Sequence, residues 1–395
     1  MPLRTPALWS ETLLTTSPPP EADQRPEGSS FVHDHTPRSM HDSYSELVLP
    51  FGSSPEFLEG YTNAAGGIRT GKLMENLDSL AGSIAYKHML GPGINTLGPI
   101  SERGFYLVTA SVDRLDMFAP LNPKRDLKLS GQVIYTGRSS MEVAVRMETI
   151  GTDIKANETV LLGRFCMVCR DAFTHSSKPV NPLTISTPEE NVLYSMGKQM
   201  KQRRSTVALQ SLSKVPPSSE EAEDLHTYFL QHGQKAASES RVWMGDTRIE
   251  NTLLMFPQER NVHQKIFGGY LMRLAYELGI TNAIMFTRHP VEFLSLDGIS
   301  FARPVPIGSI LRLTSHILHT KLGNKHDLLV HVGVEAKVVD PKTGSEQMTN
   351  DFRFTWHQPH IGAPPMMVVP KTYKEAMLWL EGRRALEFGA EIRGH

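Results

Sequence analysis

The chain has 395 residues, 39% of them hydrophobic, so it is long enough to form two or three domains with substantial cores. Its 41 Lys and Arg residues nearly balance its 42 Asp and Glu residues, and no basic face with interleaved aromatic residues occurs, which argues against a nucleic-acid partner. No run of about 18 apolar residues occurs, so the sequence predicts no transmembrane segment.

Residues 1–43 are rich in Pro, Ser, Thr and His, and this composition predicts a disordered tail. A mitochondrial presequence would be rich in Arg and poor in acidic residues, whereas this tail holds three Arg and six acidic residues. The tail is therefore a weak presequence, and only a short targeting signal within about the first 15 residues remains compatible with it.

The first half continues with a glycine-bearing approach and a helix from Gly71 to about His88. Six apolar residues spaced three and four apart form its buried stripe: Leu73, Met74, Leu77, Leu80, Ala81 and Ile84. Strand-like runs follow at 105–115, 127–135, 140–148 and 160–170. Cys166 and Cys169 lie three apart in the last run, so they face opposite sides of a strand and are expected to be buried fillers rather than a metal or redox pair.

A polar connector with an acidic helical stretch at 220–230 leads into the second half. There the helix is expected from Gly269 to about Phe286, followed by strands at 295–301, 309–318, 327–339 and 347–356. Thr372 and Glu375 have the spacing of a capping box and predict a docked C-terminal helix. The connector is too long for a plain loop and is expected to pack on the sheets.

The two helix starts align at an offset of 198 residues, with five identities in fifteen positions between Ile68–Gly82 and Ile266–Ile280. The offset drops to 184 at the next matched pair, 113–120 and 297–304, because the first half carries a longer Gly/Pro-rich loop, where insertions are tolerated. The pattern predicts an α+β protein built from two units, each a helix wrapped by an antiparallel sheet. We divide the chain into a tail (1–43), a first domain (44–175), a connector (176–245), a second domain (246–360) and a C-terminal tail with a docked helix (361–395).

Several common kinds of site are excluded by their motifs. Gly66–Lys72 matches the start of a phosphate-binding loop, but Leu73 stands where Ser or Thr would bind magnesium. No Gly-x-Ser-x-Gly elbow and no His-Glu-x-x-His or multi-cysteine pattern occurs, so neither a serine hydrolase nor a metal site is expected.

Residues 44–390 resemble the mitochondrial acyl-coenzyme A thioesterase family with two tandem hot-dog domains. The resembling segments are Asp42–Phe51, Gly71–Ala81, Thr136–Val143, Asn181–Leu183, Pro257–Leu278 and Pro370–Tyr373. The resemblance implies a tandem hot-dog fold, a fatty acyl-coenzyme A substrate, no cofactor or metal, and a ring of three chains. It also implies a mitochondrial location, with the cytoplasm as the alternative because the presequence is weak.

The resemblance further implies a site composed of an acid on one unit's helix and an amide in the other unit's approach loop. Carried over by position, these are Asp78 and Asn261, with His263 beside them. A carboxylate partly shielded by apolar neighbours can activate water or attack the thioester itself, and the amide of Gly268 or Gly269 at a helix start can stabilise an oxyanion.

Other interpretations remain open at this stage. Asp78 fits a solvated helix acid or a structural hydrogen bond as an alternative, and Asn63 with Glu277 forms a degenerate second pair, because Tyr276 stands where the second helix would need the acid. Arg138 and Arg303 are candidates for binding the phosphates of coenzyme A, and surface salt bridges explain them equally well.

The lead hypothesis is hydrolysis of acyl-coenzyme A to a fatty acid and free thiol. One alternative is a hot-dog dehydratase acting on 3-hydroxyacyl thioesters, for which His263 is the available approach-loop base. Another is an acyl-thioester binding protein whose site has decayed.

Overall fold

A computed structural model describes residues 35–93, 97, 100–151, 157–233, 240–261, 263–323, 327–359 and 365–393. The predictions for residues 1–34 therefore lie outside the described residues. The chain forms two compact units: unit 1 holds the residues up to 202 together with 257–273, and unit 2 holds 203–256 together with 274–395. The segment 257–273, which the sequence assigned to the second domain, thus belongs to the same unit as the first helix.

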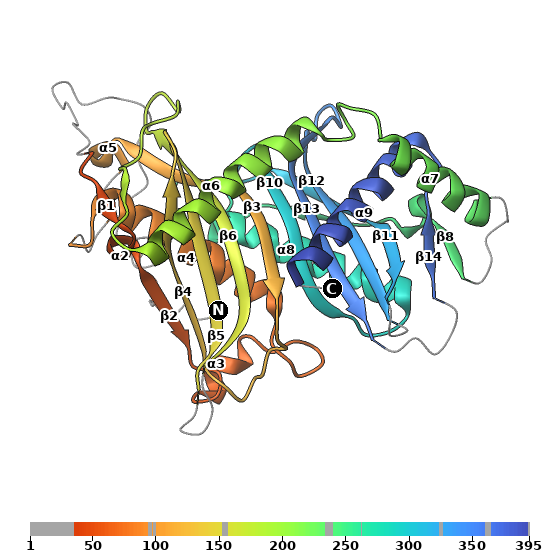
Figure 1. The fold of residues 1–395 in the computed structure, drawn as a ribbon, viewed down its shortest axis with the longest axis horizontal. Helices are drawn as coiled ribbons and strands as arrows, with labels where there is room; N and C mark the ends of the chain where they lie inside the picture. The colour runs from red at the N-terminus through yellow and green to blue at the C-terminus, as the bar shows by residue number, and fades with distance from the viewer. Residues whose placement is uncertain are drawn as a thin grey trace. The chain divides into compact units, whose positions relative to one another are not determined.

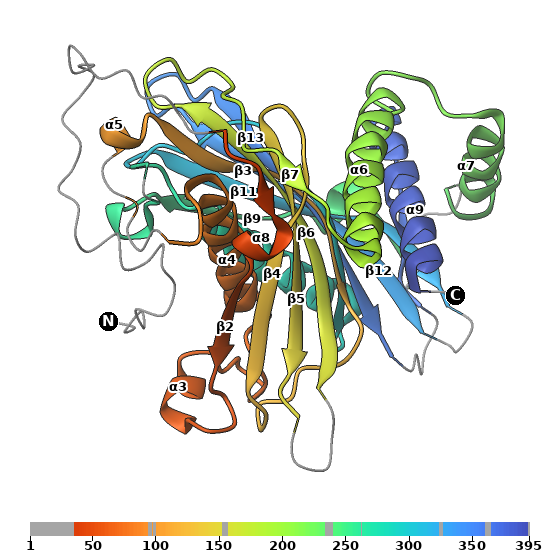
Figure 2. The ribbon, with the colours of Figure 1, turned by 60° about the vertical axis from the view of Figure 1, so that its left-hand side comes forward.

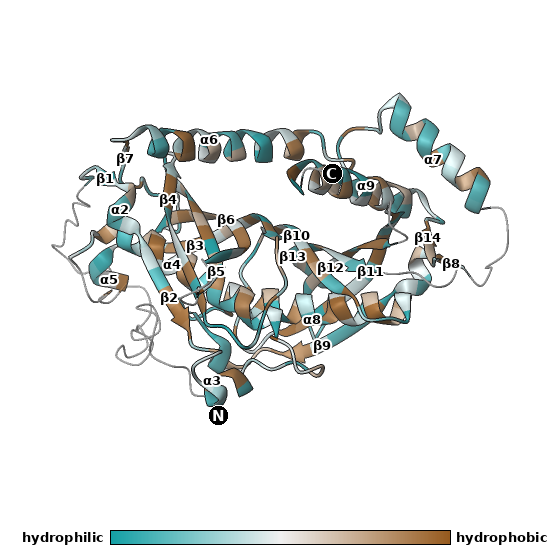
Figure 3. Ribbon diagram, turned by 60° about the horizontal axis from the view of Figure 1, so that its bottom comes forward, coloured by the Kyte–Doolittle hydropathy of each residue, from teal (hydrophilic) through white to brown (hydrophobic). Residues whose placement is uncertain are grey.

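Unit 1 is a helix packed on a five-stranded antiparallel sheet. The strands are β2 (Ser45–Leu49), β3 (Phe105–Met117), β4 (Leu127–Thr136), β5 (Ser140–Thr149) and β6 (Glu158–Asp171), in the order β2-β4-β5-β6-β3. Helix α4 (Thr70–Leu90) contacts all five strands (Figures 1 and 2). Every residue of its predicted apolar stripe is at most 1% exposed, and hydrophobic residues recur along α4 and these strands (Figure 3).

Short elements complete unit 1. They are β1 (Arg38–Ser39), α2 (Met40–Ser43), α3 (Pro55–Glu59), α5 (Ile100–Arg103), β7 (Leu183–Thr184), η2 (Pro257–Glu259) and most of α6 (Pro188–Leu209). Strands β1 and β7 pair in parallel. Cys166 and Cys169 on β6 are both buried and free, which confirms their prediction as small core residues.

Unit 2 has a second five-stranded antiparallel sheet. Its strands are β9 (Ile249–Leu254), β10 (Glu292–Phe301), β11 (Ile310–Leu322), β12 (Leu328–Val339) and β13 (Glu346–Gln358), in the order β10-β13-β12-β11-β9. Helix α8 (Gly268–Thr287) starts in unit 1 and continues in unit 2, where Gly279 lets it approach Trp356 of β13 closely. The remaining elements are α7 (Ser219–His232), β8 (Arg241–Trp243), η1 (Met244–Thr247), β14 (Met367–Val369) and α9 (Tyr373–Arg393).

Helices α6 and α9 begin with the same capping box. The hydroxyl of Thr187 accepts the N–H of Glu190 at 3.2 Å, and the Glu190 carboxylate accepts the N–H of Thr187 at 3.3 Å. Thr372 and Glu375 repeat both bonds, at 3.2 and 2.9 Å. These reciprocal bonds satisfy backbone donors that the first helical turn leaves without partners.

The two helices also approach their sheets in the same way. A Cβ added to Gly197 of α6 would lie 2.5 Å from Cβ of Tyr135, and one added to Gly382 of α9 would lie 2.7 Å from Cβ of His319. Tyr135 and His319 are separated by the repeat offset of 184 residues, so both glycines meet equivalent strand positions. The duplicated unit therefore includes an outer helix, and α6, which the sequence assigned to the connector, is the counterpart of the C-terminal helix.

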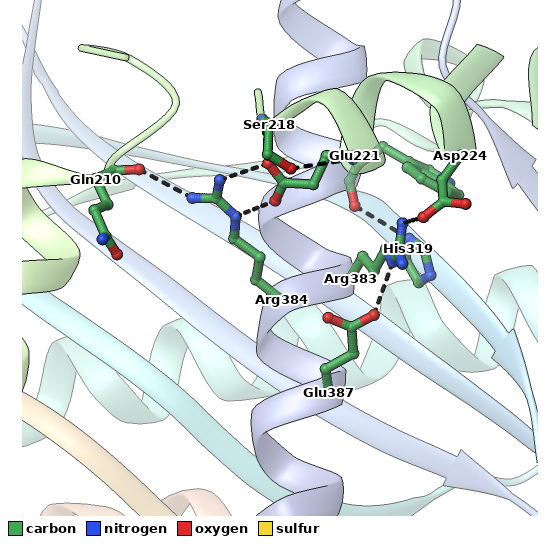
Figure 4. A network of polar contacts seen from close by, with 9 residues as sticks. Gln210, Ser218, Glu221, Asp224, His319, Arg383, Arg384 and Glu387 are labelled. Atoms are coloured by element: carbon green, nitrogen blue, oxygen red, sulfur yellow. Dashed lines mark hydrogen bonds and ion pairs between the residues drawn. The ribbon is translucent and has the colours of Figure 1, made fainter. Parts of the chain in front are cut away.

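The connector helix α7 packs on α9 and also contacts a strand, because the hydroxyl of Tyr228 donates to the Val368 carbonyl of β14 at 2.8 Å. Arg384 of α9 holds both carboxylate oxygens of Glu221, and Arg383 pairs with Asp224 and Glu387 (Figure 4). The bond to Arg384 holds the pKa of Glu221 down to about 2. The connector thus contacts strands as expected, α6 at Tyr135 and α7 at Val368, and the acidic residues of α7 also pair with arginines of the outer helix.

Within the described residues, no helix is long and apolar enough to cross a membrane.

Candidate active site

Asp78 is a buried carboxylate in the middle of α4. The residue is only 3% exposed. Thr109 of β3 donates its hydroxyl to the carboxylate at 2.8 Å, and Gly269 donates its backbone N–H. Burial raises the pKa of Asp78 to about 6, although both hydrogen bonds oppose the shift. A carboxylate with this pKa is ionised at neutral pH and is still basic enough to accept a proton.

Gly269 reaches Asp78 because it has no side chain. A Cβ at this position would lie 3.0 Å from Cα of Glu75 on α4 and 2.6 Å from the ring of Phe267. Glu75 also forms an ion pair of 3.0 Å with Arg273, its equivalent at the offset of 198. The start of α8 is therefore pressed against α4 directly beside the carboxylate.

Asn261 shapes the approach loop that leads into α8. Its Oδ1 accepts the N–H of His263 at 2.9 Å and that of Lys265 at 3.1 Å, and its own N–H donates to the Lys265 carbonyl at 2.7 Å. Its Nδ2 has no hydrogen-bond partner in the part of the chain that the structure describes. That amide is the group with which Asn261 can bind a water molecule or a carbonyl.

The first approach loop has the same turn around Asn63. Its Oδ1 accepts the N–H groups of Ala65 and Gly67, both at 2.9 Å. Unlike Asn261, Asn63 also uses its Nδ2, which donates to the Ile68 carbonyl at 3.3 Å. The duplicated Asn is thus a loop-forming residue in both repeats, and only Asn261 keeps an amide for another partner.

His263 lies against β3. Its Nε2 is 3.1 Å from the carbonyl oxygen of Leu107 and 3.2 Å from the hydroxyl of Tyr86, and its ring packs on Tyr106 with centroids 4.9 Å apart. Burial and the nearby Arg103 lower the pKa of His263 to about 3. The imidazole is therefore neutral, and because a carbonyl only accepts, Nε2 carries the proton and donates it to Leu107.

The equivalent positions in unit 2 hold an aromatic cluster. Tyr276 replaces Asp78, and Phe293 replaces Thr109 at the offset of 184. The register supports this equivalence, since strand pairing is interrupted between Thr109 and Ser111 in β3 and at the same place, between Phe293 and Ser295, in β10. The Tyr276 ring lies 5.3 Å from Phe293, 5.8 Å from Trp356 and 5.9 Å from Phe354. The second unit therefore fills this place with hydrophobic packing and has no carboxylate there.

The other residues predicted for the site form no hydrogen bond with Asp78 in the described part of the chain. Gly268 is the first residue of α8, where backbone N–H groups lack acceptors within the helix. Arg138 and Arg303 are exposed, one in each unit, and neither side chain has a partner among the described residues. Asn63 and Glu277 fall in different units, so their pairing stays a prediction.

Thr109 and Tyr86 were not predicted from the sequence. Neither belongs to a motif, because each contributes a single hydroxyl from a regular strand or helix. Comparing the repeats position by position would have found them, since their equivalents are the apolar Phe293 and Ile284. Among the described residues no group of three or more His, Cys, Asp or Glu is arranged to hold a metal ion.

Comparison with known proteins identifies the family. No protein-family model matches the chain. Acyl-coenzyme A thioesterase 9, mitochondrial, from Bos taurus is 36% identical over 358 residues, which cover 88% of this chain and 78% of that protein. The protein of the same name from Mus musculus is 37% identical over 357 residues, with the same coverage.

The chain belongs to the acyl-coenzyme A thioesterase family.

Solved structures resemble the thioesterase at lower similarity. An acyl-ACP thioesterase from Bacteroides thetaiotaomicron matches with 12% identity and a TM-score of 0.45, covering 81% of this chain and all of the other. An acyl-coenzyme A hydrolase from Staphylococcus aureus matches with 20% identity and a TM-score of 0.35, covering 39% of this chain and 92% of the other. The two units described above, each a helix on antiparallel strands, confirm the predicted fold. Membership of the family confirms the predicted thioesterase activity, and the dehydratase alternative is not favoured.

Proposed function

We propose that this thioesterase hydrolyses fatty acyl-coenzyme A to a free fatty acid and coenzyme A at the site around Asp78. The observation that carries the proposal is a buried carboxylate with a pKa of about 6, held by Thr109 and Gly269, in only one of two repeats. A structural acid serving the fold would be expected in both repeats, whereas Tyr276 occupies the other.

Asp78 can catalyse the hydrolysis by either of two routes. As a general base it takes a proton from water, the hydroxide attacks the thioester carbonyl, and the C–S bond breaks with return of a proton to the thiolate. As a nucleophile it attacks the carbonyl itself, expels coenzyme A as the thiolate and forms a mixed anhydride that water then hydrolyses. In both routes the Nδ2 of Asn261 orients the water or the carbonyl, and the N–H of Gly268 at the start of α8 stabilises the oxyanion.

Neither route needs a cofactor or a metal ion. Arg138 and Arg303 remain candidates for binding the phosphates of coenzyme A, as exposed cations. We also propose a mitochondrial location, because the relatives above carry that word in their names, and an assembly of three chains.

His263 does not fit the base of a dehydratase. With a pKa of about 3 and its Nε2 donating to a backbone carbonyl, the imidazole offers no proton acceptor on that side. We therefore prefer hydrolysis to dehydration.

Release of free thiol from acyl-coenzyme A of increasing chain length tests the proposal. We expect the wild-type protein to release thiol with a rate that rises through a pKa near 6, and Asp78→Asn to release almost none. A wild-type protein inactive on every chain length, or a fully active Asp78→Asn variant, would contradict the proposal.

Rapid-quench kinetics separate the two routes. A burst of thiol equal to the enzyme concentration, ahead of the fatty acid, indicates attack by Asp78. Thiol and fatty acid appearing together show that no acyl intermediate accumulates, as activation of water requires.

A further inference from the structure

Two groups of hydrogen bonds, here called the first and second triangle, connect the same parts of unit 1. Each joins α4 and β3 to the segment formed by the approach loop and the start of α8. In the first, Asp78 of α4 is bonded to Thr109 of β3 and to Gly269 at the start of α8. In the second, the backbone of Leu107 of β3 is bonded to Tyr86 of α4 and to His263 of the approach loop. The second triangle lies about two helical turns along α4 and two residues along β3 from the first.

In the second triangle, side chains satisfy both backbone groups of Leu107 on β3. The N–H of Leu107 donates to the Tyr86 hydroxyl at 3.1 Å, and its carbonyl accepts Nε2–H of His263 at 3.1 Å. Opposite Leu107 on β6 stands Cys169, whose own backbone groups bond elsewhere. Both bonds at Leu107 are therefore supplied by one helix and one loop, which fixes these two elements to the strand.

The approach loop connects His263 to the residues of the proposed site. The N–H of His263 donates to Oδ1 of Asn261 at 2.9 Å, and Gly269 follows six residues after His263. Anchoring the imidazole to β3 therefore sets the position of both the Asn261 amide and the Gly269 N–H relative to Asp78.

The other repeat lacks these groups. At the offset of 198, Ala65 stands for His263 and Ile284 for Tyr86, although the Asn turn itself is retained. The two anchoring side chains thus occur only with the loop and helix that meet at the buried carboxylate. A device needed for the turn alone would be present in both loops.

We propose that Tyr86 and His263 form a positioning clamp that holds the approach loop, with Asn261 and Gly269, in register with Asp78. The clamp rests on the proposed function of the Asp78 site. His263 acts through its Nε2–H donor on Leu107 and takes no proton from substrate or water. Its Nδ1 is buried without a partner among the described residues, so a charged imidazole would bury a donor that nothing there satisfies.

Two isosteric variants of His263 test the clamp. Gln places an N–H near the position of Nε2, whereas Asn places its polar atoms near the position of Nδ1. We expect His263→Gln to keep kcat within about threefold, and His263→Asn to lower it about 10- to 100-fold with a nearly unchanged KM, because small displacements in a site have effects of this size. Tyr86→Phe removes the shared hydroxyl and is expected to behave like His263→Asn.

The pH profile distinguishes positioning from a general loss of folded protein. If the loop moves, the Gly269 N–H no longer stabilises the Asp78 carboxylate, so the pKa of Asp78 rises further. We expect the rising limb of kcat to move upward from about 6 by about one pH unit in His263→Asn and Tyr86→Phe, and to stay in place in His263→Gln. A mere decrease in the folded fraction would lower the amplitude without moving the limb.

Several outcomes would overturn the clamp. They are wild-type rates in both His263→Asn and Tyr86→Phe, or a His263→Gln variant as slow as His263→Asn, which would make the imidazole itself essential. If the wild-type protein hydrolyses no acyl-coenzyme A, the proposed function fails, and hydrogen exchange of residues 257–273 then decides on the clamp. Faster exchange in Tyr86→Phe and His263→Asn but not in His263→Gln supports it, and equal exchange in all variants refutes it.

Discussion

The two units share hydrogen bonds that satisfy their backbone, and they differ in the side chains around the buried carboxylate and the approach loop. Ser43 accepts the N–H of Val133 at 2.9 Å in unit 1, and Thr247 accepts the N–H of Ile317 at 2.9 Å in unit 2. The capping boxes of the outer helices and the two Asn turns repeat in the same manner. Duplicated features of this kind serve the fold, because each satisfies backbone groups that any copy of the unit must satisfy.

The clearest difference lies in the middle of the central helix. Unit 1 buries the Asp78–Thr109 pair there, whereas unit 2 buries Tyr276 against Phe293 and Trp356. Burying a carboxylate disfavours its charged form, while aromatic pairs contribute about 0.5–1.5 kcal/mol each beyond their buried area. Unit 1 therefore buries a reactive group that opposes folding when it is charged, and unit 2 has aromatic packing in its place.

The largest expected effect is on activity. We expect Asp78→Asn to lower the rate of thiol release by about 10³-fold or more, because the amide can neither accept a proton nor attack a thioester. Tyr276→Phe, the matched change in unit 2, is expected to stay within about twofold. Similar losses in both variants would mean that the two positions share the chemistry.

A charge forced into unit 2 should be strongly destabilising. Tyr276→Asp places a carboxylate among Phe293, Phe354 and Trp356, so we expect the free energy of unfolding to fall by about 3–5 kcal/mol at pH 8. Urea denaturation measures it, with Tyr276→Phe as the control that keeps the ring. A loss below about 1 kcal/mol would show that this place accepts a charge as readily as unit 1 does.

Removing the charge from unit 1 should be stabilising above pH 6. Because folding raises the pKa of Asp78 from 3.8 to about 6, the folded state binds more protons between these values, and the wild-type protein loses stability as the pH rises through this window. Asp78→Asn avoids this cost, which corresponds to at most about 3 kcal/mol. We expect urea denaturation to find the variant more stable at pH 8, with the advantage gone below about pH 4. An advantage that does not change with pH would contradict this account.

The smallest expected effects are on stability, at the capping boxes that both units share. Thr187→Ala and Thr372→Ala each remove one half of a capping box and should each lower the free energy of unfolding by about 1 kcal/mol. Thr187→Ser and Thr372→Ser keep the hydroxyl, so both variants should keep the stability of the wild-type protein. Clearly unequal losses in urea denaturation would show that the outer helices do not have equal roles.

Much of the fold was predictable from the sequence because its periodicity is local. Both central helices and all eight long strands occur where the apolar patterns predicted them, with ends that differ by a few residues. Short edge strands such as β2 and β9 were missed, since five or six residues carry too little pattern. Helix α6 was missed as part of the repeat because it is polar and only Gly197 is buried along its length.

The candidate site was predictable only in part. The duplicated helix starts drew attention to Asp78, Asn261 and Gly269, because unequal residues at equivalent positions are visible in one sequence. The sequence did not reveal that the Gly269 N–H donates to Asp78, nor that His263 is held by Tyr86 and Leu107. Tyr86 and His263 are 177 positions apart, and Leu107 and His263 are 156 positions apart, so no local pattern encodes these contacts.

By itself, the sequence determined that the chain is a duplicated α+β unit, that one copy carries an acid where the other carries Tyr276, and which family the chain resembles. Three features became visible only in the folded chain: residues 257–273 belong with the first helix, burial brings the pKa of Asp78 to about 6, and His263 is a neutral donor. Hydrophobic periodicity is written along the chain, whereas desolvation and hydrogen bonding depend on which distant residues surround a group once the core has formed.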